Sequence, residues 1–393
     1  MSSKLRYGLL AAALLILAAV LSGCASSSSR AALTGASWPG ISTSDDAIFV
    51  AAGPQVYAIN PDTGTTIWAY PAEPTKNLTF YAPPAVDNDL VVVADYTNTL
   101  HALNRQSGQS RWTFTSDRSS RFIGGAAMND TSIYAGTVDG TVYALDRETG
   151  DVIWQYGAAR DVWSTPLLDG ETLYVTSLDK HLYAFNATSG EKLWEFPREG
   201  TEPSADEVGA MVGTPTLYEG VLYFGSFGNH VYALDASTQE LLWTYHTENW
   251  VWGSPAVDEE SGLLVGGDLD GRIFALDKDT GDEIWVFNTD GPVVGTPAIG
   301  DKDGERVVFA TSGDTKLYTL NLADGTAADS PISVDAEFSA FLSGTSERPI
   351  PIYAAPVLYN GMVLIGLHQG NYPLYAFDQE TLLERWHYEP PQS

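Results

Sequence analysis

The stretch VYALDRETGDVIWQY, residues 142–156, decides the fold of this chain. It consists of an extended tetrad, an Asp that begins a turn, a Thr-Gly pair and a second extended piece that carries a tryptophan. Asp146 can accept hydrogen bonds from backbone N–H groups two or three residues on, and Gly150 can adopt a left-handed conformation. The stretch therefore predicts two antiparallel strands joined by a tight turn.

This phrase recurs along the chain, at intervals of mostly 40 to 49 residues. The copy at residues 317–321, the seventh of eight along the chain, keeps the turn but lacks the tryptophan. Two further extended pieces precede each tetrad, as residues 214–217 and 221–225 show, so each unit supplies four strands, A to D. Eight such units predict an all-β fold, an eight-bladed β-propeller of four-stranded antiparallel blades.

The repeated tryptophans are predicted to seal each blade to its neighbour. A small residue stands at a fixed distance before each of them, which suggests a large ring laid over a small gap. Burying one indole removes roughly 150 to 250 Å² from water, an upper estimate of about 4 to 6 kcal/mol per contact. The predicted docking residues are Trp68, Trp112, Trp154, Trp194, Trp243, Trp285 and Trp386.

Short Asp-Gly pairs mark the hairpins between strands B and C. Asp139-Gly140 and Asp270-Gly271 are typical of two-residue type I′ turns, which need positive φ at both central residues.

The N-terminus has the pattern of an export signal. Lys4 and Arg6 precede an apolar run, residues 8–20, and LSGC at residues 21–24 resembles the lipobox of bacterial lipoproteins. We expect a signal peptide at 1–23, lipidation of Cys24, a flexible tether at 24–35, the propeller at 36–389 and a tail at 390–393. Ala25 fits sorting to the outer membrane in a two-membrane cell; in a single-membrane cell the protein would face outward. An ordinary secretory signal is the alternative.

Charge restricts the partners. The chain has a formal net charge of −30, which repels nucleic acid because nucleic-acid binding needs a basic footprint. Many carboxylates fall in the A-to-B and C-to-D turns, which share one face of a propeller. We expect that face to be solvated, and the propeller to be monomeric.

A family resemblance follows from the motif Ala-x-Asp-x-x-Thr-Gly-x-x-x-Trp, intact from Ala144 to Trp154 and from Ala275 to Trp285. Over about residues 36–389 the chain resembles the quinoprotein-like (PQQ-repeat) propellers, in which this segment is the tryptophan-docking motif. In its lipobox, its size and its eight repeats, the chain is most similar to the outer-membrane assembly lipoproteins of that family. This resemblance implies a docking scaffold whose partners are envelope proteins, including barrel-assembly machinery.

Other members of the family are quinone-dependent dehydrogenases that hold PQQ and calcium, many with a vicinal disulfide. Cys24 is the only cysteine, so that disulfide is impossible here. No residue-by-residue match to the calcium ligands is found, and we expect neither PQQ nor calcium and no enzyme activity. The alternatives are a propeller whose funnel binds a small ligand, such as a quinone or a sugar, and a quinone (PQQ)-dependent dehydrogenase that uses the central funnel.

The D-to-A crossings share the other face with the B-to-C hairpins. The four tryptophans outside the docking set, Trp38 among them, fall near the starts of strand A, which lines the axial channel. Aromatic residues beside arginine are typical of interaction hot spots. The candidate partner or ligand residues are Phe80, Tyr81, Arg121, Phe122, Arg160, Trp163, Trp250 and Trp252. The alternative is that these rings plug the funnel as core. Two long crossings, residues 197–212 and 336–350, lie on the same face.

Other chemistry finds little support in the sequence. The six histidines are scattered without ligand-like spacing, and no nucleophile elbow surrounds a serine. The run Asp301 to Glu305 lacks the full pattern of a calcium loop and is expected to be a solvated turn, with a bound ion as the alternative. No catalytic or metal-ligating residue is predicted.

Overall fold

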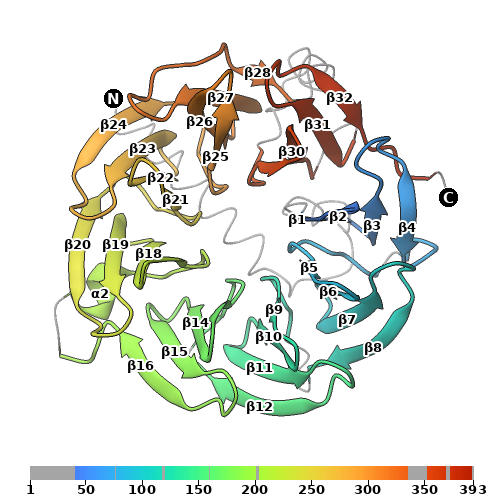
Figure 1. Ribbon diagram of the computed structural model, residues 1–393. Coiled ribbons are helices and arrows are strands. Elements are labelled where there is room, and N and C mark those ends of the chain that lie inside the picture. Colours follow the sequence, from blue (N-terminus) through green and yellow to red (C-terminus); the bar gives the residue numbers. More distant parts are fainter. Residues whose placement is uncertain are drawn as a thin grey trace, which may run out of the picture.

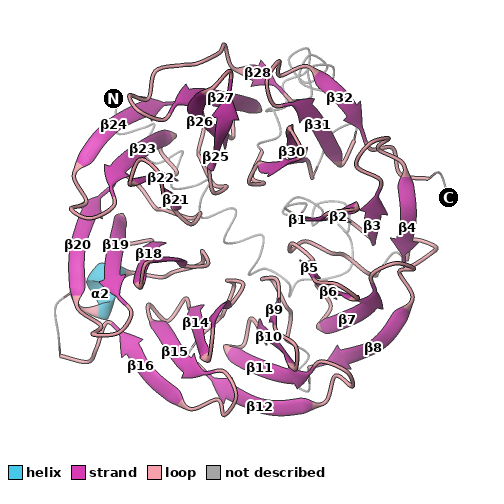
Figure 2. Ribbon diagram, viewed as in Figure 1, coloured by secondary structure: helices cyan, strands magenta, loops and turns pink. Residues whose placement is uncertain are grey.

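The computed structural model describes residues 40–75, 77–116, 120–158, 160–200, 203–334, 352–368 and 372–391. Within them, eight four-stranded antiparallel sheets stand around a central axis (Figure 1). Strands dominate, and the helix of the described part, α2 (Ala205–Val208), lies in the crossing between the fourth and fifth sheets (Figure 2). The predicted all-β, eight-bladed propeller is confirmed. Cys24, Trp38 and the crossing 336–350 fall outside the described residues.

Each blade takes its four strands in chain order, with A innermost and D outermost (Figure 1). The strands of blades 1 to 4 are β1 (Gly40–Ser44), β2 (Ala47–Ala52), β3 (Gln55–Ile59), β4 (Thr66–Tyr70); β5 (Ala85–Val86), β6 (Leu90–Ala94), β7 (Thr99–Asn104), β8 (Ser110–Thr115); β9 (Ala127–Met128), β10 (Ser132–Gly136), β11 (Thr141–Asp146), β12 (Val152–Gly157); and β13 (Leu167–Asp169), β14 (Thr172–Thr176), β15 (Leu182–Asn186), β16 (Lys192–Phe196).

The strands of blades 5 to 8 are β17 (Thr216–Tyr218), β18 (Val221–Gly225), β19 (His230–Asp235), β20 (Leu241–His246); β21 (Ala256–Asp258), β22 (Leu263–Gly267), β23 (Arg272–Asp277), β24 (Glu283–Asn288); β25 (Ala298–Lys302), β26 (Glu305–Thr311), β27 (Lys316–Asn321), β28 (Ile332–Ser333); and β29 (Val357–Tyr359), β30 (Met362–Gly366), β31 (Leu374–Asp378), β32 (Glu384–His387). No helix of the described part is long and apolar enough to cross a membrane.

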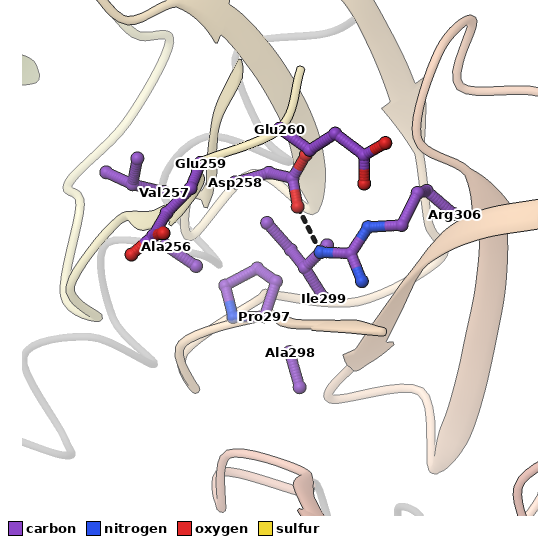
Figure 3. Close-up of a pocket in the computed structure, with 9 residues that line it drawn as sticks. All are labelled: Ala256, Val257, Asp258, Glu259, Glu260, Pro297, Ala298, Ile299 and Arg306. Atoms are coloured by element: carbon purple, nitrogen blue, oxygen red, sulfur yellow. Dashed lines mark hydrogen bonds and ion pairs between the residues drawn. The ribbon is translucent and has the colours of Figure 1, made fainter. Parts of the chain in front are cut away.

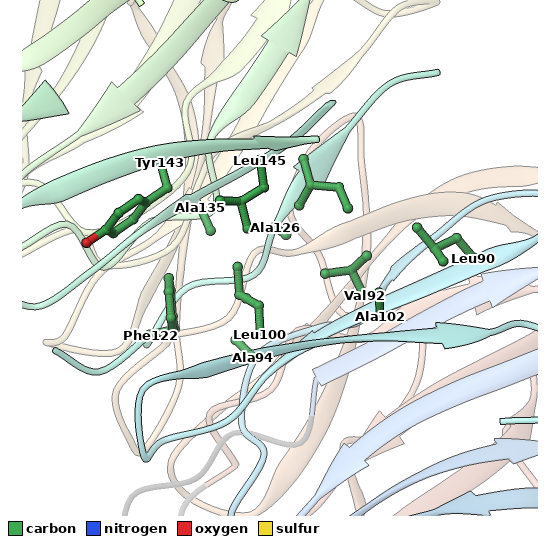
Figure 4. Close-up of a cluster of buried hydrophobic side chains, with 11 residues drawn as sticks. Leu90, Val92, Ala94, Leu100, Ala102, Phe122, Ala126, Ala135, Tyr143 and Leu145 are labelled. Carbon is green, nitrogen blue, oxygen red and sulfur yellow. The ribbon is translucent and has the colours of Figure 1, made fainter. Parts of the chain in front are cut away.

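Burial explains why the middle strands have continuous apolar sequences. Strands B and C are covered on both faces by neighbouring blades, as β10 and β11 show, while β12 alternates between exposed and half-buried residues. Figure 4 shows one such interface, in which Leu90, Val92 and Leu100 of blade 2 meet Tyr143 and Leu145 of blade 3. Hydrophobic packing between blades therefore forms the core of the ring.

The turn between strands C and D forms as the sequence predicts. The Asp146 carboxylate accepts from the backbone N–H groups of Glu148 and Thr149, at 2.9 Å each. Gly150 has φ of 77°, in the left-handed region. This turn places the glycine where the preceding blade can approach it.

Six of the seven docking tryptophans lie against the turn of the next blade. The Trp154 indole Nε1 donates to the carbonyl oxygen of Ala187 in blade 4 (2.8 Å). A Cβ on Gly190, in the same turn, would lie 2.6 Å from the Trp154 ring. The small gap is therefore provided by the next blade's glycine, while Ala144 lies opposite Trp154 on the adjacent strand. Equivalent indole hydrogen bonds are made by Trp68, Trp112, Trp243, Trp285 and Trp386. Trp194 is half-buried, and the corresponding turn of blade 5 has Gln239 with φ of 59°.

Blade 7 lacks the tryptophan, and blade 8 compensates. At the glycine position of blade 8 stands Leu382, with φ of 56°. Its side chain is only 8% exposed and packs in a cluster that includes Val307 and Phe309 of blade 7. The leucine therefore occupies the space that a tryptophan fills at the other seams.

We expect Leu382→Ala to destabilise the fold by about 2 kcal/mol, because truncating a buried leucine leaves a cavity. Leu383→Ala, at a side chain that is 69% exposed, is the matched control and should change the free energy of unfolding by less than about 0.5 kcal/mol. Urea unfolding measures both. Equal effects of the two substitutions would contradict the filling role.

The ring closes by packing blade 8 on blade 1 without sharing a strand. The Trp386 indole donates to the carbonyl oxygen of Pro61 (3.0 Å), and the hydroxyls of Thr66 and Tyr388 are hydrogen-bonded at 2.8 Å. The Tyr359 hydroxyl donates to the carbonyl oxygen of Ser44 (2.8 Å). Among the described residues each terminal blade has all four strands of its own.

The type I′ prediction for the B-to-C hairpins is wrong. Gly140 and Gly271 have φ of 84° and 89°, but Asp139 and Asp270 are not in the left-handed region. The Gly140 N–H donates to the carbonyl oxygen of Thr137 (3.0 Å), so one glycine closes a longer turn. A single positive φ is sufficient because the loop is longer than two residues.

The prediction that the acidic face is solvated fails at Asp258, which is buried, and at Asp87, which is half-buried. Arg147 of blade 3 is buried and forms ion pairs with Asp87 and Asp89 of blade 2. Arg306 of blade 7 forms an ion pair with Asp258 of blade 6, which is 1% exposed. These acids are therefore inter-blade contacts, a role that a charge count cannot reveal.

The turn at Asp301 to Glu305 is an A-to-B hairpin packed on blade 8. Asp301 forms an ion pair with Arg306 (3.2 Å), and Asp303 with Lys302 (2.7 Å). The Glu380 carboxylate accepts from the Asp303 N–H (2.6 Å). Both aspartates thus have basic partners.

Candidate partner-binding face

The face formed by the D-to-A crossings and B-to-C hairpins carries an apolar cluster, here called the mouth cluster. Its buried members are Trp163, Val212, Trp252, Leu269 and Val294; the partly buried ones are Ile123, Val138, Leu178, Phe227, Trp250 and Tyr353. Because each D-to-A crossing runs from the outermost strand to the innermost, the residues just before strand A lie around the axis. The cluster therefore lies at one mouth of the channel.

Six crossings and four hairpins, from blades 3 to 8, supply this cluster. Trp163 precedes blade 4 and Trp252 precedes blade 6, yet their ring centroids are 6.3 Å apart. Side chains from non-adjacent blades thus meet at the mouth. Trp163 and Trp252 are only 6% and 8% exposed. For these two rings the alternative holds, because they plug the funnel as core.

Trp250 stands at the edge of the mouth cluster. Its ring stacks on Phe227 of the blade 5 hairpin, with centroids 4.4 Å apart and planes 11° from parallel. The side chain is half-buried, so part of the indole stays accessible. The Trp250 carbonyl oxygen accepts from the Leu269 N–H (3.0 Å), which fixes the crossing on the blade 6 hairpin.

A second aromatic group lies on the same face at blades 2 and 3. The Arg121 guanidinium donates to the Tyr96 hydroxyl (2.9 Å) and lies 4.7 Å from the centroid of that ring. Tyr81 packs edge-on against Tyr96, with centroids 4.8 Å apart. Burial raises the pKa of both tyrosines, so both hydroxyls stay protonated at neutral pH.

Two predicted face residues belong elsewhere. Phe80 is completely buried in the core of blades 1 and 2, and Phe122 is buried between blades 2 and 3 (Figure 4). Each forms a β-bridge with its blade, which turns the ring into the sheet interface and away from the surface. Their assignment to the face is therefore wrong. Tyr81 and Arg121, each adjacent to one of them, are half-buried, and Arg160 is exposed.

Four hairpin residues of the face were not predicted from the sequence. Each of them directly follows the first polar residue of a B-to-C hairpin. The pairs are Thr137-Val138, Ser177-Leu178, Ser226-Phe227 and Asp268-Leu269. An apolar residue at a turn position that normally faces water is a signal in the sequence.

One buried carboxylate under the mouth cluster, that of Asp268, has an oxygen without a hydrogen bond. The Asp268 Oδ1 accepts from the N–H groups of Asp270 (2.9 Å) and Arg272 (3.1 Å), but its Oδ2 has no hydrogen bond. In blade 2 the equivalent Asp95 is satisfied by His101 (2.8 Å), whereas strand C of blade 6 has Phe274 at the position of that histidine. Burial raises the pKa of Asp268 to about 6.

This carboxylate should make stability depend on pH. Because its folded pKa lies above the unfolded value of 3.8, the native state binds more protons between about pH 4 and 6, so the free energy of unfolding falls as pH rises through that range. The loss is at most about 3 kcal/mol. Asp268→Asn keeps an oxygen for the two N–H groups and should remove this component. Urea unfolding at pH 4, 5.5 and 7 measures it; identical pH profiles would contradict the assignment.

The mouth does not fit a quinone cofactor with calcium. Calcium needs several oxygen ligands, yet the mouth cluster is apolar, and the described residues contain no group of three or more His, Cys, Asp or Glu that could hold a metal. The buried Trp163 Nε1 has no hydrogen-bond partner among the described residues, but it is a single donor.

The fold is thus that of a quinoprotein-like propeller, with an aromatic cluster at one mouth of its channel. Three overlapping stretches, residues 25–122, 99–211 and 202–393, match the family model described as outer membrane protein assembly factor BamB. Because the matches cover most of the chain, the chain belongs to this family.

Individual relatives are distant. The chain is 31% identical over 107 residues to the outer membrane protein assembly factor BamB of Vibrio cholerae, covering 24% of this chain and 28% of that protein. It is 30% identical over 109 residues to a quinohemoprotein alcohol dehydrogenase of Comamonas testosteroni, covering 25% of this chain and 15% of that protein. The matched stretches thus span less than a third of either relative.

The crystal structure of BamB from Moraxella catarrhalis has a similar fold, with a TM-score of 0.65 at 20% identity, covering 84% of this chain and 92% of that one.

Proposed function

We propose that the protein is an extracytoplasmic scaffold that docks partner proteins during envelope or outer-membrane protein assembly. The observation that carries this proposal is the match to the assembly-factor family along residues 25–393. The aromatic face supports it, because half-exposed aromatic rings beside arginine are typical of protein contacts. A rigid ring that presents this surface needs no catalytic group.

The docking surface in this proposal comprises Trp250, Tyr81 and Arg121, together with the exposed Arg160 of the crossing before blade 4. Trp250 is held on Phe227, and Arg121 is held on Tyr96, so little side-chain entropy is lost when a partner binds. The buried rings of Trp163 and Trp252 form the floor that keeps the crossings in place.

Membrane attachment through lipid on Cys24 is part of the same proposal. The lipobox at residues 21–24 supports it, as does the family match, which begins directly after that cysteine. Anchoring would hold the propeller beside the membrane in which its partners assemble; in a two-membrane cell we propose the periplasmic side of the outer membrane.

The test is affinity purification of the full chain from detergent-extracted membranes, followed by mass spectrometry. We expect barrel-assembly components with the wild type and their loss with Trp250→Ala plus Arg121→Ala. Ile153→Ala plus Leu383→Ala, at exposed apolar side chains of the outer rim, is the control and should retain the partners. Equal recovery from both variants would contradict the role of the face.

The dehydrogenase alternative rests on the local match to the Comamonas enzyme. A quinone absorption band in the purified protein, with no protein partner recovered, would favour that alternative. We propose that no such band is present.

A further inference from the structure

Two histidines of blade 5 lie opposite each other on the face that carries the mouth cluster. His230 begins β19, His246 ends β20, and the two residues are paired across the sheet. The Thr247 N–H donates to the carbonyl oxygen of Asn229 (2.8 Å), so the adjacent pair of histidines is a non-hydrogen-bonded pair. Side chains come closest at such pairs. The two imidazole rings accordingly have centroids 5.0 Å apart.

The hydrogen bonding of His230 leaves one ring nitrogen available to a ligand. Its Nδ1 lies 2.8 Å from the carbonyl oxygen of Gly228 and must donate, because a carbonyl oxygen only accepts. Burial lowers the pKa of His230 more than the nearby Glu207 carboxylate raises it, so the ring is neutral at pH 7. The Nε2 of the neutral ring then carries a lone pair. A backbone carbonyl that holds the second nitrogen in this way is the usual support of a metal-binding histidine.

The ring of His246 is available as well. The side chain is exposed, and no hydrogen bond or ion pair joins its ring to another described residue. Zn–N bonds of about 2.0 to 2.1 Å at tetrahedral angles place the centroids of two imidazoles on one ion about 5 Å apart. The observed separation of 5.0 Å therefore suits a shared ion without movement of the strands.

The corresponding pairs of other blades have different chemistry. Blade 2 has Thr99 opposite Thr115, with the two hydroxyls hydrogen-bonded at 3.2 Å, and blade 6 has Arg272 opposite Asn288. Blade 4 begins its third strand after a histidine, His181, but no histidine stands opposite it. The repeat and its folding therefore do not require the histidine pair of blade 5.

We propose that His230 and His246 together bind one transition-metal ion of the Zn²⁺, Cu²⁺ or Ni²⁺ class, with water at the remaining positions. Imidazole nitrogens suit these ions, whereas Ca²⁺ and Mg²⁺ need oxygen ligands. The ion joins strand C of blade 5 to strand D. It lies near the stacked rings of Phe227 and Trp250, which belong to the hairpin and the crossing that flank the pair. The proposal does not depend on the proposed function.

Attraction of any cation to the acidic surface is the competing explanation, since the chain has a net charge of −30. One acidic site lies between blades 6 and 7, where Asp258 pairs with Arg306 and the next residues, Glu259 and Glu260, are exposed (Figure 3). Carboxylates of this kind also attract Mg²⁺. An excess of Mg²⁺ therefore suppresses binding to the acidic surface and leaves a site made of imidazoles unaffected.

The experiment is calorimetric titration of the purified full chain with ZnCl₂, at neutral pH, in a non-coordinating buffer that contains excess MgCl₂. We expect one Zn²⁺ site per chain. His230→Thr plus His246→Thr, which copies the threonine pair of blade 2, should weaken binding at least about tenfold. His246→Thr alone changes an exposed side chain and should weaken binding to a similar extent. Zn²⁺ should also raise the urea midpoint of the wild type and not that of the double variant.

Two controls separate the pair from single histidines and from surface charge. His181→Thr removes the histidine of blade 4, and Glu259→Gln plus Glu260→Gln removes two exposed charges; both should leave the Zn²⁺ affinity unchanged. No Zn²⁺ binding above the MgCl₂ background, or equal affinity of the wild type and His246→Thr, would overturn the proposal. A loss with the glutamate variant and none with the histidine variants would assign the ion to the acidic surface instead.

Discussion

Trp154→Ala should lower the free energy of unfolding by about 3 to 5 kcal/mol, because the ring seals blade 3 to blade 4. The indole lies against Gly190, donates a hydrogen bond to the carbonyl oxygen of Ala187 and packs near Phe185, with centroids 6.3 Å apart. Removing it opens a cavity at the seam and leaves a carbonyl group without its donor. Urea unfolding followed by tryptophan fluorescence measures the loss.

The neighbouring residue provides the control. Ile153 lies on the same strand, points outward and is 48% exposed, so Ile153→Ala should cost less than about 0.5 kcal/mol. If both substitutions were equally mild, the indole would not hold the blades together. If both were equally severe, the effect would belong to strand β12 and not to the seam.

Gly150→Ala should destabilise the protein by about 3 kcal/mol, for two separable reasons. Its φ of 77° strains any L-residue that carries a Cβ. The new Cβ would also lie 2.6 Å from the ring of Trp112, which docks from blade 2. Either the ring or the turn must move, and the seam between blades 2 and 3 opens.

Gly220→Ala separates these two reasons. Gly220 has φ of 80°, but a Cβ there would meet nothing within 4 Å. It should show the backbone strain alone, about 1 kcal/mol. In a Trp112→Ala background the excess cost of Gly150→Ala should disappear, which a double-mutant cycle measures. An excess that survives the loss of the indole would show that something other than the ring occupies the space.

The repeat made the architecture predictable. One stretch, residues 142–156, contains the strand pattern, the turn and the docking ring, and its copies supply blade number and order. The degenerate seventh copy was recognisable from its missing tryptophan. The compensation by Leu382 could not be predicted, because Leu382 lies in the turn of another repeat and contacts blade 7 only in the folded propeller.

The candidate face was only partly predictable. Because Trp163, Trp250 and Trp252 fall just before strand A in the sequence, their location at the mouth was predictable. It failed for Phe80 and Phe122, because a β-bridge turns each ring into a blade interface. Phe227 and Leu269 were missed because hairpin tips are normally solvated, and only the closed ring brings them against the crossings.

The sequence by itself determined the repeat, the turn chemistry and the tryptophan seams of this protein, because these depend on contacts at a fixed spacing along the chain. Only the tertiary structure decided which acids are inter-blade contacts and which aromatic rings are core. Each of these depends on which residues of one repeat face those of the neighbouring repeat, and the spacing within a single repeat does not show that pairing.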